Sequence, residues 1–437
     1  MKSLLPLALA VLALAGFALE APAQEWTRFR GPNGTGISHA KTIPTNLTTA
    51  DINWKVELPG VGHSSPVLWG DRIFLTSTGD NAGGLNVLCL NAADGKLLWQ
   101  RDFPLTPFSK HKFNSFASAT PAVSDSAVYV VWNEPDHYFL TALDHNGGKL
   151  WQRDFGPFVS QHACGTSPIV VGDKVILGGE QDGQKFVPGS DRDGKSFIVA
   201  VDAKTGDTIW QIPRNSVVVA YSTPCVRESK DGKSSLIFNS QAHGIYAVAP
   251  DTGKVLWEYG QAFDKRSVSS PFIAGDLIFG SSGSGGGGNR AVAIKAGDAT
   301  PSGQPELAYD VKKAAPYVPT GITVGDLVWL WSDGGIVTCL QAKTGEIRYQ
   351  ERVGGNFFGS PVWVDGRLFC VSTSGELDVV EASDKFKVLQ RFPLGELCHS
   401  TPAVAGGRMY IRTEKHLLSL GGGKAAARPQ TSAAAAK

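Results

Sequence analysis

The stretch Asp202-Ala203-Lys204-Thr205-Gly206-Asp207-Thr208-Ile209-Trp210 is one copy of a pattern that returns along the chain. Each copy is a glycine-containing turn followed, four residues after the glycine, by an aromatic that ends an apolar run. Such a turn between apolar runs is typical of a β-hairpin. The aromatics are Trp99, Trp151, Trp210, Trp257 and Tyr349, after Gly95, Gly147, Gly206, Gly253 and Gly345. The chain therefore carries an internal repeat whose unit ends in a β-strand.

A second phrase marks where each repeat begins. It is a Ser or Thr followed by Pro and then apolar residues, and a degenerate copy stands at Pro319-Thr320-Gly321-Ile322. These anchors lie roughly 40 to 56 residues apart, which is the period of propeller blades. The hydroxyl residues of the eight anchors are Ser65, Thr120, Ser167, Thr223, Ser270, Thr320, Ser360 and Thr401.

Each anchor is followed by two more hairpin features. A Gly-Asp turn such as Gly172-Asp173 or Gly275-Asp276 separates the first two apolar runs, and a third run precedes the turn before the aromatic. Four strands joined by short turns make one antiparallel blade. The sequence predicts an all-β, eight-bladed β-propeller with four-stranded antiparallel blades.

The two ends of the repeat array complement each other. Residues 52–56 read as an outer strand with its Trp54 but with no blade before it, and residues 417–420 read as a third strand with no fourth strand after it. We expect the N-terminal strand to complete the last blade. This arrangement closes the ring and removes free sheet edges.

The recurring aromatics have a structural and a functional interpretation. A row of aromatics can stack on sugars, but a large flat side chain at a fixed place in every repeat is better explained by packing between neighbouring blades. We favour the inter-blade role for Trp54, Trp99, Trp151, Trp210, Trp257 and Tyr349.

The loops differ strongly between the two faces of the predicted ring. Second-to-third loops and inter-blade links share one face, and they are long at 103–118, 155–164, 179–196 and 281–289. Long loops on one face mark the expected functional surface. The candidates for ligand binding near the central channel on this face are His63, His162, Tyr221, Arg266, Tyr317, Phe358 and His399.

Two features of this face stay open. His63 and His399 fall in neighbouring blades across the ring closure, so they either line one pocket or each form local hydrogen bonds, which we favour. Asp191-Arg192-Asp193-Gly194 is faintly like a calcium loop but lacks the distal Glu, so we favour a polar turn. No metal ligand set and no catalytic residue can be assigned from the sequence.

The chain ends predict an exported protein. Residues 1–23 have a lysine, an apolar run and Ala21-Pro22-Ala23, which is typical of a cleaved signal peptide; the alternative, a membrane anchor, needs a longer apolar run. Residues 24–51 form an N-terminal extension, 52–420 the propeller, and 421–437 a disordered Gly/Ala-rich tail. We expect a periplasmic or secreted monomer without a lipidation cysteine or a membrane span in the mature chain.

Composition narrows the possible partners. The net charge is +1, and no basic excess points to nucleic acid. Cys89, Cys164, Cys225, Cys339, Cys370 and Cys398 include no adjacent or C-x-x-C pair. An exported protein permits disulfides, but we interpret most of these cysteines as small buried hydrophobes.

The phrases at 202–210 and 251–257 closely resemble the pyrroloquinoline-quinone-type (PQQ-like) propeller repeat, and the resemblance covers about residues 52 to 420. Its members include quinone-dependent alcohol dehydrogenases and a non-enzymatic lipoprotein of the outer-membrane β-barrel assembly machine. Residues 26–36 resemble the leader of exported, largely uncharacterised members.

The resemblance implies two alternative functions. One is a PQQ-dependent alcohol dehydrogenase with calcium, a class that uses adjacent cysteines, a Trp floor and carboxylate ligands. The sequence has no adjacent cysteines, no convincing Asp base with a Glu–Asn calcium set, and no C-x-x-C-H haem signature. The other is a binding or scaffold module that presents its long-loop face to another exported or envelope protein, a peptide or a glycan. We favour the binding module, without intrinsic catalysis and with no cofactor expected.

Overall fold

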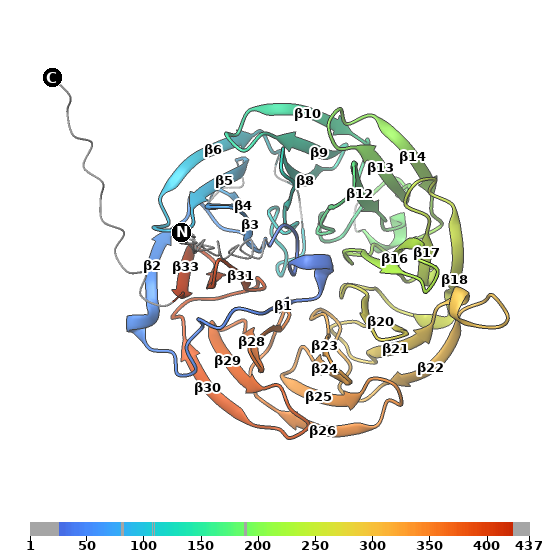
Figure 1. The fold of residues 1–437 in the computed structure, drawn as a ribbon. Coiled ribbons are helices and arrows are strands. Elements are labelled where there is room, and N and C mark those ends of the chain that lie inside the picture. Colours follow the sequence, from blue (N-terminus) through green and yellow to red (C-terminus); the bar gives the residue numbers. More distant parts are fainter. Residues whose placement is uncertain (1–25, 80–82, 107, 109, 188–189, 423–437) are drawn as a thin grey trace, which may run out of the picture.

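A computed structural model describes residues 26–79, 83–106, 108, 110–187 and 190–422. Eight small antiparallel sheets stand around a central axis like the blades of a propeller (Figure 1). The predicted all-β class and the eight four-stranded blades are confirmed.

The blades follow one another along the chain, and the strands of each are listed from the axis outward. Blades 1 to 4 are β3 (Val67–Trp69), β4 (Arg72–Thr78), β5 (Leu85–Asn91), β6 (Leu97–Phe103); β7 (Ala122–Val123), β8 (Val128–Glu134), β9 (His137–Leu143), β10 (Lys149–Asp154); β11 (Ile169–Val171), β12 (Lys174–Gly179), β13 (Phe197–Asp202), β14 (Thr208–Pro213); and β15 (Cys225–Glu228), β16 (Ser234–Ser240), β17 (Gly244–Val248), β18 (Val255–Tyr259).

Blades 5 to 8 complete the ring. They are β19 (Phe272–Ala274), β20 (Leu277–Ser282), β21 (Arg290–Lys295), β22 (Glu306–Val311); β23 (Ile322–Val324), β24 (Leu327–Trp331), β25 (Ile336–Gln341), β26 (Ile347–Arg352); β27 (Val362–Val364), β28 (Arg367–Val371), β29 (Glu376–Glu381), β30 (Val388–Pro393); and β31 (Ala403–Ala405), β32 (Arg408–Arg412), β33 (His416–Gly421), β2 (Ile52–Glu57).

The last blade is built from both ends of the array, as predicted. β2 pairs antiparallel with β33, with Trp54 opposite Ser419 and Val56 opposite Leu417. Because the first and last strands of the array share one sheet, opening the ring requires breaking the β2–β33 ladder.

The repeated glycine and the repeated tryptophan meet across blade boundaries. Trp151 of blade 2 packs on Gly206 of blade 3, and a Cβ on this glycine would lie 2.7 Å from the indole. The indole Nε1 also donates a hydrogen bond to Ala203 O at 3.1 Å. Gly206 has a φ of 77°, so both the turn and the close approach require glycine.

The same contact recurs around the ring. Trp54, Trp99 and Trp210 lie on Gly95, Gly147 and Gly253 of the next blade, and Trp257 lies on Gly297. In blade 5, Tyr309 takes the place of the tryptophan and lies on Gly345, while Tyr349 of blade 6 packs against Phe386 of blade 7. These aromatics therefore fill the wedges between blades.

The remaining elements are short. β1 (Ile37–Ser38) runs parallel to β27 at the inner edge of blade 7. Single 3-10 turns are η1 (Pro32–Gly34), η2 (Thr49–Asp51), η3 (Gln184–Phe186), η4 (Gly260–Ala262) and η5 (Gly297–Ala299). In the described part of the chain, all six cysteines are buried and unpaired, and no helix has the length and apolarity to cross a membrane. The predicted signal peptide and nearly all of the predicted tail lie outside the described residues.

Candidate functional site

The anchors form a ring of hydrogen bonds around the propeller axis, which we call the hydroxyl ring. The backbone N–H of one anchor donates to the hydroxyl oxygen of the anchor in the next blade, at 2.9–3.0 Å. Seven such bonds join neighbouring blades, including the bond from Thr401 to Ser65 across the ring closure. The ring consists of Ser65, Thr120, Ser167, Thr223, Ser270, Thr320, Ser360 and Thr401.

The sequence pattern showed the anchors but not this role. At seven of the eight positions the hydroxyl oxygen accepts the N–H of the preceding blade, which explains the preference for Ser and Thr there. Each hydroxyl that accepts in this way keeps its own proton for donation to another group.

One end of the channel is filled by the chain's own N-terminal segment, residues 26–38. Trp26 bridges to Leu68 of blade 1, and Val123 of blade 2 donates its N–H to Thr27 O at 2.7 Å. Asn33 accepts the N–H of Val226 in blade 4 at 2.8 Å. Figure 1 shows this segment, in blue, at the centre of the ring. We call residues 26–38 the plug.

Arg30 holds the plug in place. Its guanidinium is fully buried and donates to Thr320 O at 3.1 Å, Gly321 O at 3.0 Å and Pro361 O at 3.0 Å. Arg28 donates to Pro224 O in the same way. Burial lowers the pKa of Arg30 to about 9 and that of Arg28 to about 10, so both stay charged at neutral pH.

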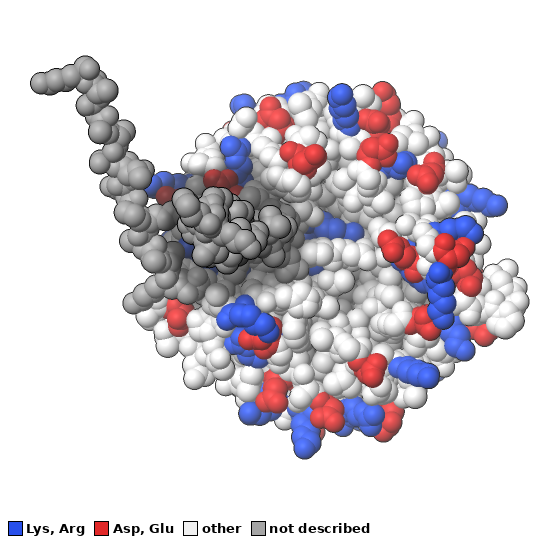
Figure 2. Space-filling model, in the orientation of Figure 1, with Lys and Arg blue, Asp and Glu red and all other residues white. Residues whose placement is uncertain are grey.

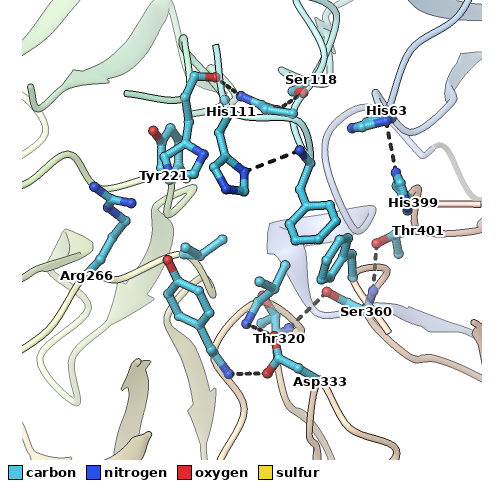
Figure 3. Close-up of a pocket in the computed structure, with 18 of the residues that line it drawn as sticks. His63, His111, Ser118, Tyr221, Arg266, Thr320, Asp333, Ser360, His399 and Thr401 are labelled. Carbon is cyan, nitrogen blue, oxygen red and sulfur yellow. Dashed lines mark hydrogen bonds between the residues drawn. The ribbon is translucent and has the colours of Figure 1, made fainter. Parts of the chain in front are cut away.

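The other end of the channel is a cavity of about 630 Å³ on the long-loop face. Phe29 of the plug and seven of the eight ring anchors line it. All seven residues that the sequence analysis singled out line it as well: His63, His162, Tyr221, Arg266, Tyr317, Phe358 and His399. Figure 3 shows His63 and His399 on one flank and Tyr221 and Arg266 on the other. That these residues bind a ligand stays a prediction.

Rings in mutual contact run from one flank of the cavity to the other. Successive ring centroids lie 4.4–6.0 Å apart, and most pairs are tilted or edge-to-face. In order they are Tyr221, His162, His111, Phe113, Phe358, His399 and His63, which we call the ring belt. Phe113 is 53% exposed and stands at the mouth.

His63 and His399 contact each other directly. His399 Nδ1 and His63 Nε2 lie 2.9 Å apart, so one nitrogen donates to the other. The preferred expectation of separate local hydrogen bonds is therefore wrong, because the ring closure brings the two links together. Burial, with His399, Arg412 and Lys110 nearby, lowers the pKa of His63 well below its usual value, and burial lowers that of His399. The pair is neutral at pH 7.

Arg266 and two carboxylates define the opposite flank. Arg266 Nη2 lies 3.3 Å from Asp182 Oδ1, and its guanidinium stacks 5.9 Å from the Tyr221 ring. Asp182 also accepts the N–H of Val219 at 2.8 Å and that of Gln161 at 3.0 Å. Asp333 accepts two backbone N–H groups, and burial raises its pKa. These carboxylates hold loops in place.

Other predicted features lie away from the channel. Asp193 accepts the N–H of Gln184 at 2.7 Å and Arg192 pairs with Asp136 at 2.6 Å, which is a polar-turn arrangement. This loop borders a separate cavity of about 600 Å³ between blades 2 and 3. Among the described residues, no group of three His, Cys, Asp or Glu side chains is placed to hold a metal.

The sequence reasoning missed several residues of the cavity. His111 and Phe113 lie inside the long link 103–118, and Asp333 lies in a short second-to-third loop. The length of the link pointed to that face, but no repeat position showed which of its residues turn inward. Phe29 was missed because the extension was not expected to enter the channel.

A sequence profile of the family described as outer membrane protein assembly factor BamB matches residues 43–217, 181–351 and 310–386. The matches span most of the chain, so the protein belongs to this family of PQQ-like propellers, as its repeats indicated. Among curated proteins, no sequence matches.

Solved structures share the fold at low identity. BamB from Moraxella catarrhalis is 14% identical, with a TM-score of 0.57 over 84% of this chain and 97% of that one. A europium-containing methanol dehydrogenase is 12% identical, with a TM-score of 0.65 over 92% and 98%. Quinohemoprotein alcohol dehydrogenase from Comamonas testosteroni is 14% identical, with a TM-score of 0.61 over 92% and 81%. The fold is shared by dehydrogenases and by BamB, whose family is described as an assembly factor, so function must be argued from the cavity.

Proposed function

We propose that the protein is a non-catalytic binding module whose long-loop face takes part of a partner into the central cavity. The observation that carries this proposal is the cavity itself, about 630 Å³ in volume and lined by the ring belt and the hydroxyl ring. Ligand pockets of roughly 300–1,000 Å³ combine apolar walls with a few placed polar groups in this way.

We infer that the partner is another exported or envelope protein, or a peptide or glycan, and that the chain acts as a monomer in the periplasm or outside the cell. The family description, which names an outer-membrane assembly factor, supports a protein partner at the envelope. The signal-peptide pattern of residues 1–23 supports export.

The alternative function, quinone-dependent alcohol oxidation, fits the cavity poorly. Calcium needs several oxygen ligands, but the carboxylate of Asp333 is the one that lines the described cavity, and it already accepts two backbone N–H groups. No tryptophan lines the cavity, and no two cysteines are adjacent in the sequence. The side chains present do not match a quinone–calcium site, and we derive no redox step.

Binding pools test the proposal directly. The mature protein would be mixed with a pool of short peptides and with a pool of oligosaccharides, and the retained molecules measured by ultrafiltration and mass spectrometry. We expect at least one pool to bind, with affinity at least tenfold lower for Phe113→Ala because this ring stands at the mouth. Phe186→Ala is the matched control, since Phe186 is 37% exposed and lies outside the cavity.

Two results would contradict the binding module. One is that neither pool binds. The other is that pyrroloquinoline quinone with calcium binds tightly and supports dye-linked alcohol oxidation, which would favour the enzyme.

A further inference from the structure

Three buried arginines bond to residues of or next to the hydroxyl ring, although none of them lines the cavity, and among the described residues none forms an ion pair with a carboxylate. Besides Arg28 and Arg30 of the plug, Arg412 of β32 donates from Nη1 to Ser64 O at 3.1 Å, Ser64 Oγ at 2.8 Å and Thr76 O at 2.8 Å. Burial lowers the pKa of Arg412 to about 9.

The three charges are spread around the hydroxyl ring. Arg28 bonds the carbonyl of Pro224 directly after one anchor, Arg30 bonds the anchor Thr320, and Arg412 bonds Ser64 directly before another. Figure 2 shows that charges of both signs alternate around the rim of the face that it draws. Buried charges without a counter-ion are costly, so a bound anion would stabilise this arrangement.

The hydroxyl ring adds donors to the same region. Seven of its hydroxyls line the cavity, and within the described residues those that accept a backbone N–H form no second hydrogen bond, so each can donate its proton to a ligand. The two nearby carboxylates, Asp182 and Asp333, are already bonded as described above. The inner part of the cavity is therefore rich in hydroxyl donors, and buried positive charge lies behind its wall.

The outer part of the cavity is apolar and its inner end is closed. Phe113 and Phe358 stand in the ring belt, Val268 and Val318 line the wall, and Phe29 of the plug lines the base. A blind cavity of this kind admits the end of a chain rather than a strand that passes through it.

We propose that the cavity binds the C-terminal carboxylate of a peptide or protein whose last residues are apolar. The carboxylate lies at the hydroxyl ring, and the apolar side chains lie against Phe113 and Phe358. Backbone and hydroxyl donors capture chain termini in other proteins by the same chemistry. This inference rests on the proposed binding function and names its ligand.

A glycan fits these walls less well than a peptide. The belt rings pack edge-to-face or tilted against one another, which leaves few open aromatic faces for a sugar to stack on. Sugar hydroxyls would also lose water against Phe29, Val268 and Val318 without gaining partners there.

The test compares two peptide pools that differ in one group. Full-length mature protein would be titrated with N-acetylated tripeptides ending in Leu or Phe, either as free acids or as C-terminal amides. We expect the acids to bind at least tenfold more tightly, since each lost charge-assisted hydrogen bond weakens binding.

Two anchor variants locate the carboxylate. Ser360→Ala removes a hydroxyl that lines the cavity, whereas Ser270→Ala removes a hydroxyl of the ring that does not line it. Each variant also loses one inter-blade hydrogen bond. Ser360 accepts this bond from the N–H of Thr320, and Ser270 accepts it from the N–H of Thr223. We expect Ser360→Ala to weaken binding of the acids at least threefold and Ser270→Ala to leave it unchanged, with similar unfolding midpoints.

The outcomes separate this inference from the proposed function. Equal binding of acids and amides, or equal effects of the two variants, overturns the carboxylate site and leaves a binding cavity. Binding of oligosaccharides but not of peptide acids assigns the cavity to a glycan and overturns it too. If neither peptides nor oligosaccharides bind, both proposals fall.

Discussion

The two ends of the central channel are built on the same ring of first strands, but one end is filled and the other is open. At one end the plug fills the axis, and Arg30 satisfies main-chain carbonyls of blades 6 and 7. At the other end the links leave a cavity bordered by the ring belt. The plugged end contributes stability, and the open end has side chains placed for something outside the chain.

The comparison also shows where charge is tolerated. The two guanidiniums of the plug are buried and bond only to carbonyl oxygens, whereas at the open end burial lowers the pKa of His63 and of His399. A fold that only needed a filled channel would not require hydroxyl donors and an exposed aromatic at the remaining mouth. Substitutions at the two ends should therefore divide between loss of stability and loss of binding.

The largest expected effect is on the plugged end. Arg30→Met keeps an apolar stem but leaves the carbonyls of Thr320, Gly321 and Pro361 without their donor. We expect the free energy of unfolding to fall by about 3 kcal/mol, since buried acceptors without a partner are costly. Urea unfolding followed by tryptophan fluorescence measures this change.

Arg352→Met is the control, because Arg352 is exposed and bonds one carbonyl, Gly334 O, at 2.7 Å. It should change stability by less than about 0.5 kcal/mol. Equal losses for both variants would mean that the plug does not stabilise the ring.

Much of the fold could be predicted from the sequence because each blade repeats the same local rules. Gly206 with Trp151 illustrates this, since one position fixes both a turn and an inter-blade contact. The closing strand was predictable because residues 52–56 form an outer strand with no blade before it. Residues 417–420 form a third strand with no fourth strand after it. Blade 5 was harder to read, since Tyr309 replaces the tryptophan and sits at a different spacing from its glycine.

The cavity was only partly predictable because its contacts join distant links. Their position just before an anchor placed His63 and His399 on the long-loop face, as predicted. The contact of 2.9 Å between their ring nitrogens depends on the ring closure, which the local sequence does not show. Phe113 reaches Phe358 across the axis from a link without repeat character. The buried arginines of the plug belong to no repeat, since residues 26–38 occur once, and so no repeat position indicated their contacts.

The second expected effect is a pH dependence at the open end. Burial, with Arg266 and His111, lowers the pKa of His162 to about 4. The unfolded chain takes up this proton near pH 6.5 and the folded protein does not, so stability is lost as pH falls from 6.5 to 4. We expect a loss of roughly 1–2 kcal/mol, reduced from the full shift because the side chain is partly exposed to solvent.

His162→Gln isolates this contribution. Unfolding of the wild type and the variant would be compared at pH 7 and pH 4.5, because other groups titrate equally in both. The variant should lose less stability than the wild type between these pH values. An equal loss of stability in the wild type and the variant between pH 7 and pH 4.5 would show that His162 is not held neutral by the cavity.

The third effect concerns the hydroxyl ring, which separates the two ends. Thr401→Val keeps the shape of the side chain but removes the acceptor for the N–H of Ser360. We expect a loss of about 1 kcal/mol, the value of one buried hydrogen bond. Thr344→Val is the control, because Thr344 lies in an exposed turn and its Oγ1 accepts the N–H of Glu346 at 3.3 Å. This variant should lower the free energy of unfolding by less than Thr401→Val does. Equal losses in the two variants would mean that the hydroxyl ring does not stabilise the fold.

The smallest effect on stability should come from the residue that matters most for binding. Phe113 is 53% exposed, and its contacts are with other rings of the mouth rather than with a blade core. We therefore expect Phe113→Ala to change the free energy of unfolding by less than about 0.5 kcal/mol, while peptide binding falls at least tenfold. A large loss of stability would mean that Phe113 closes the channel as a structural element. The open end would then be a second plug, and the difference between the two ends would disappear.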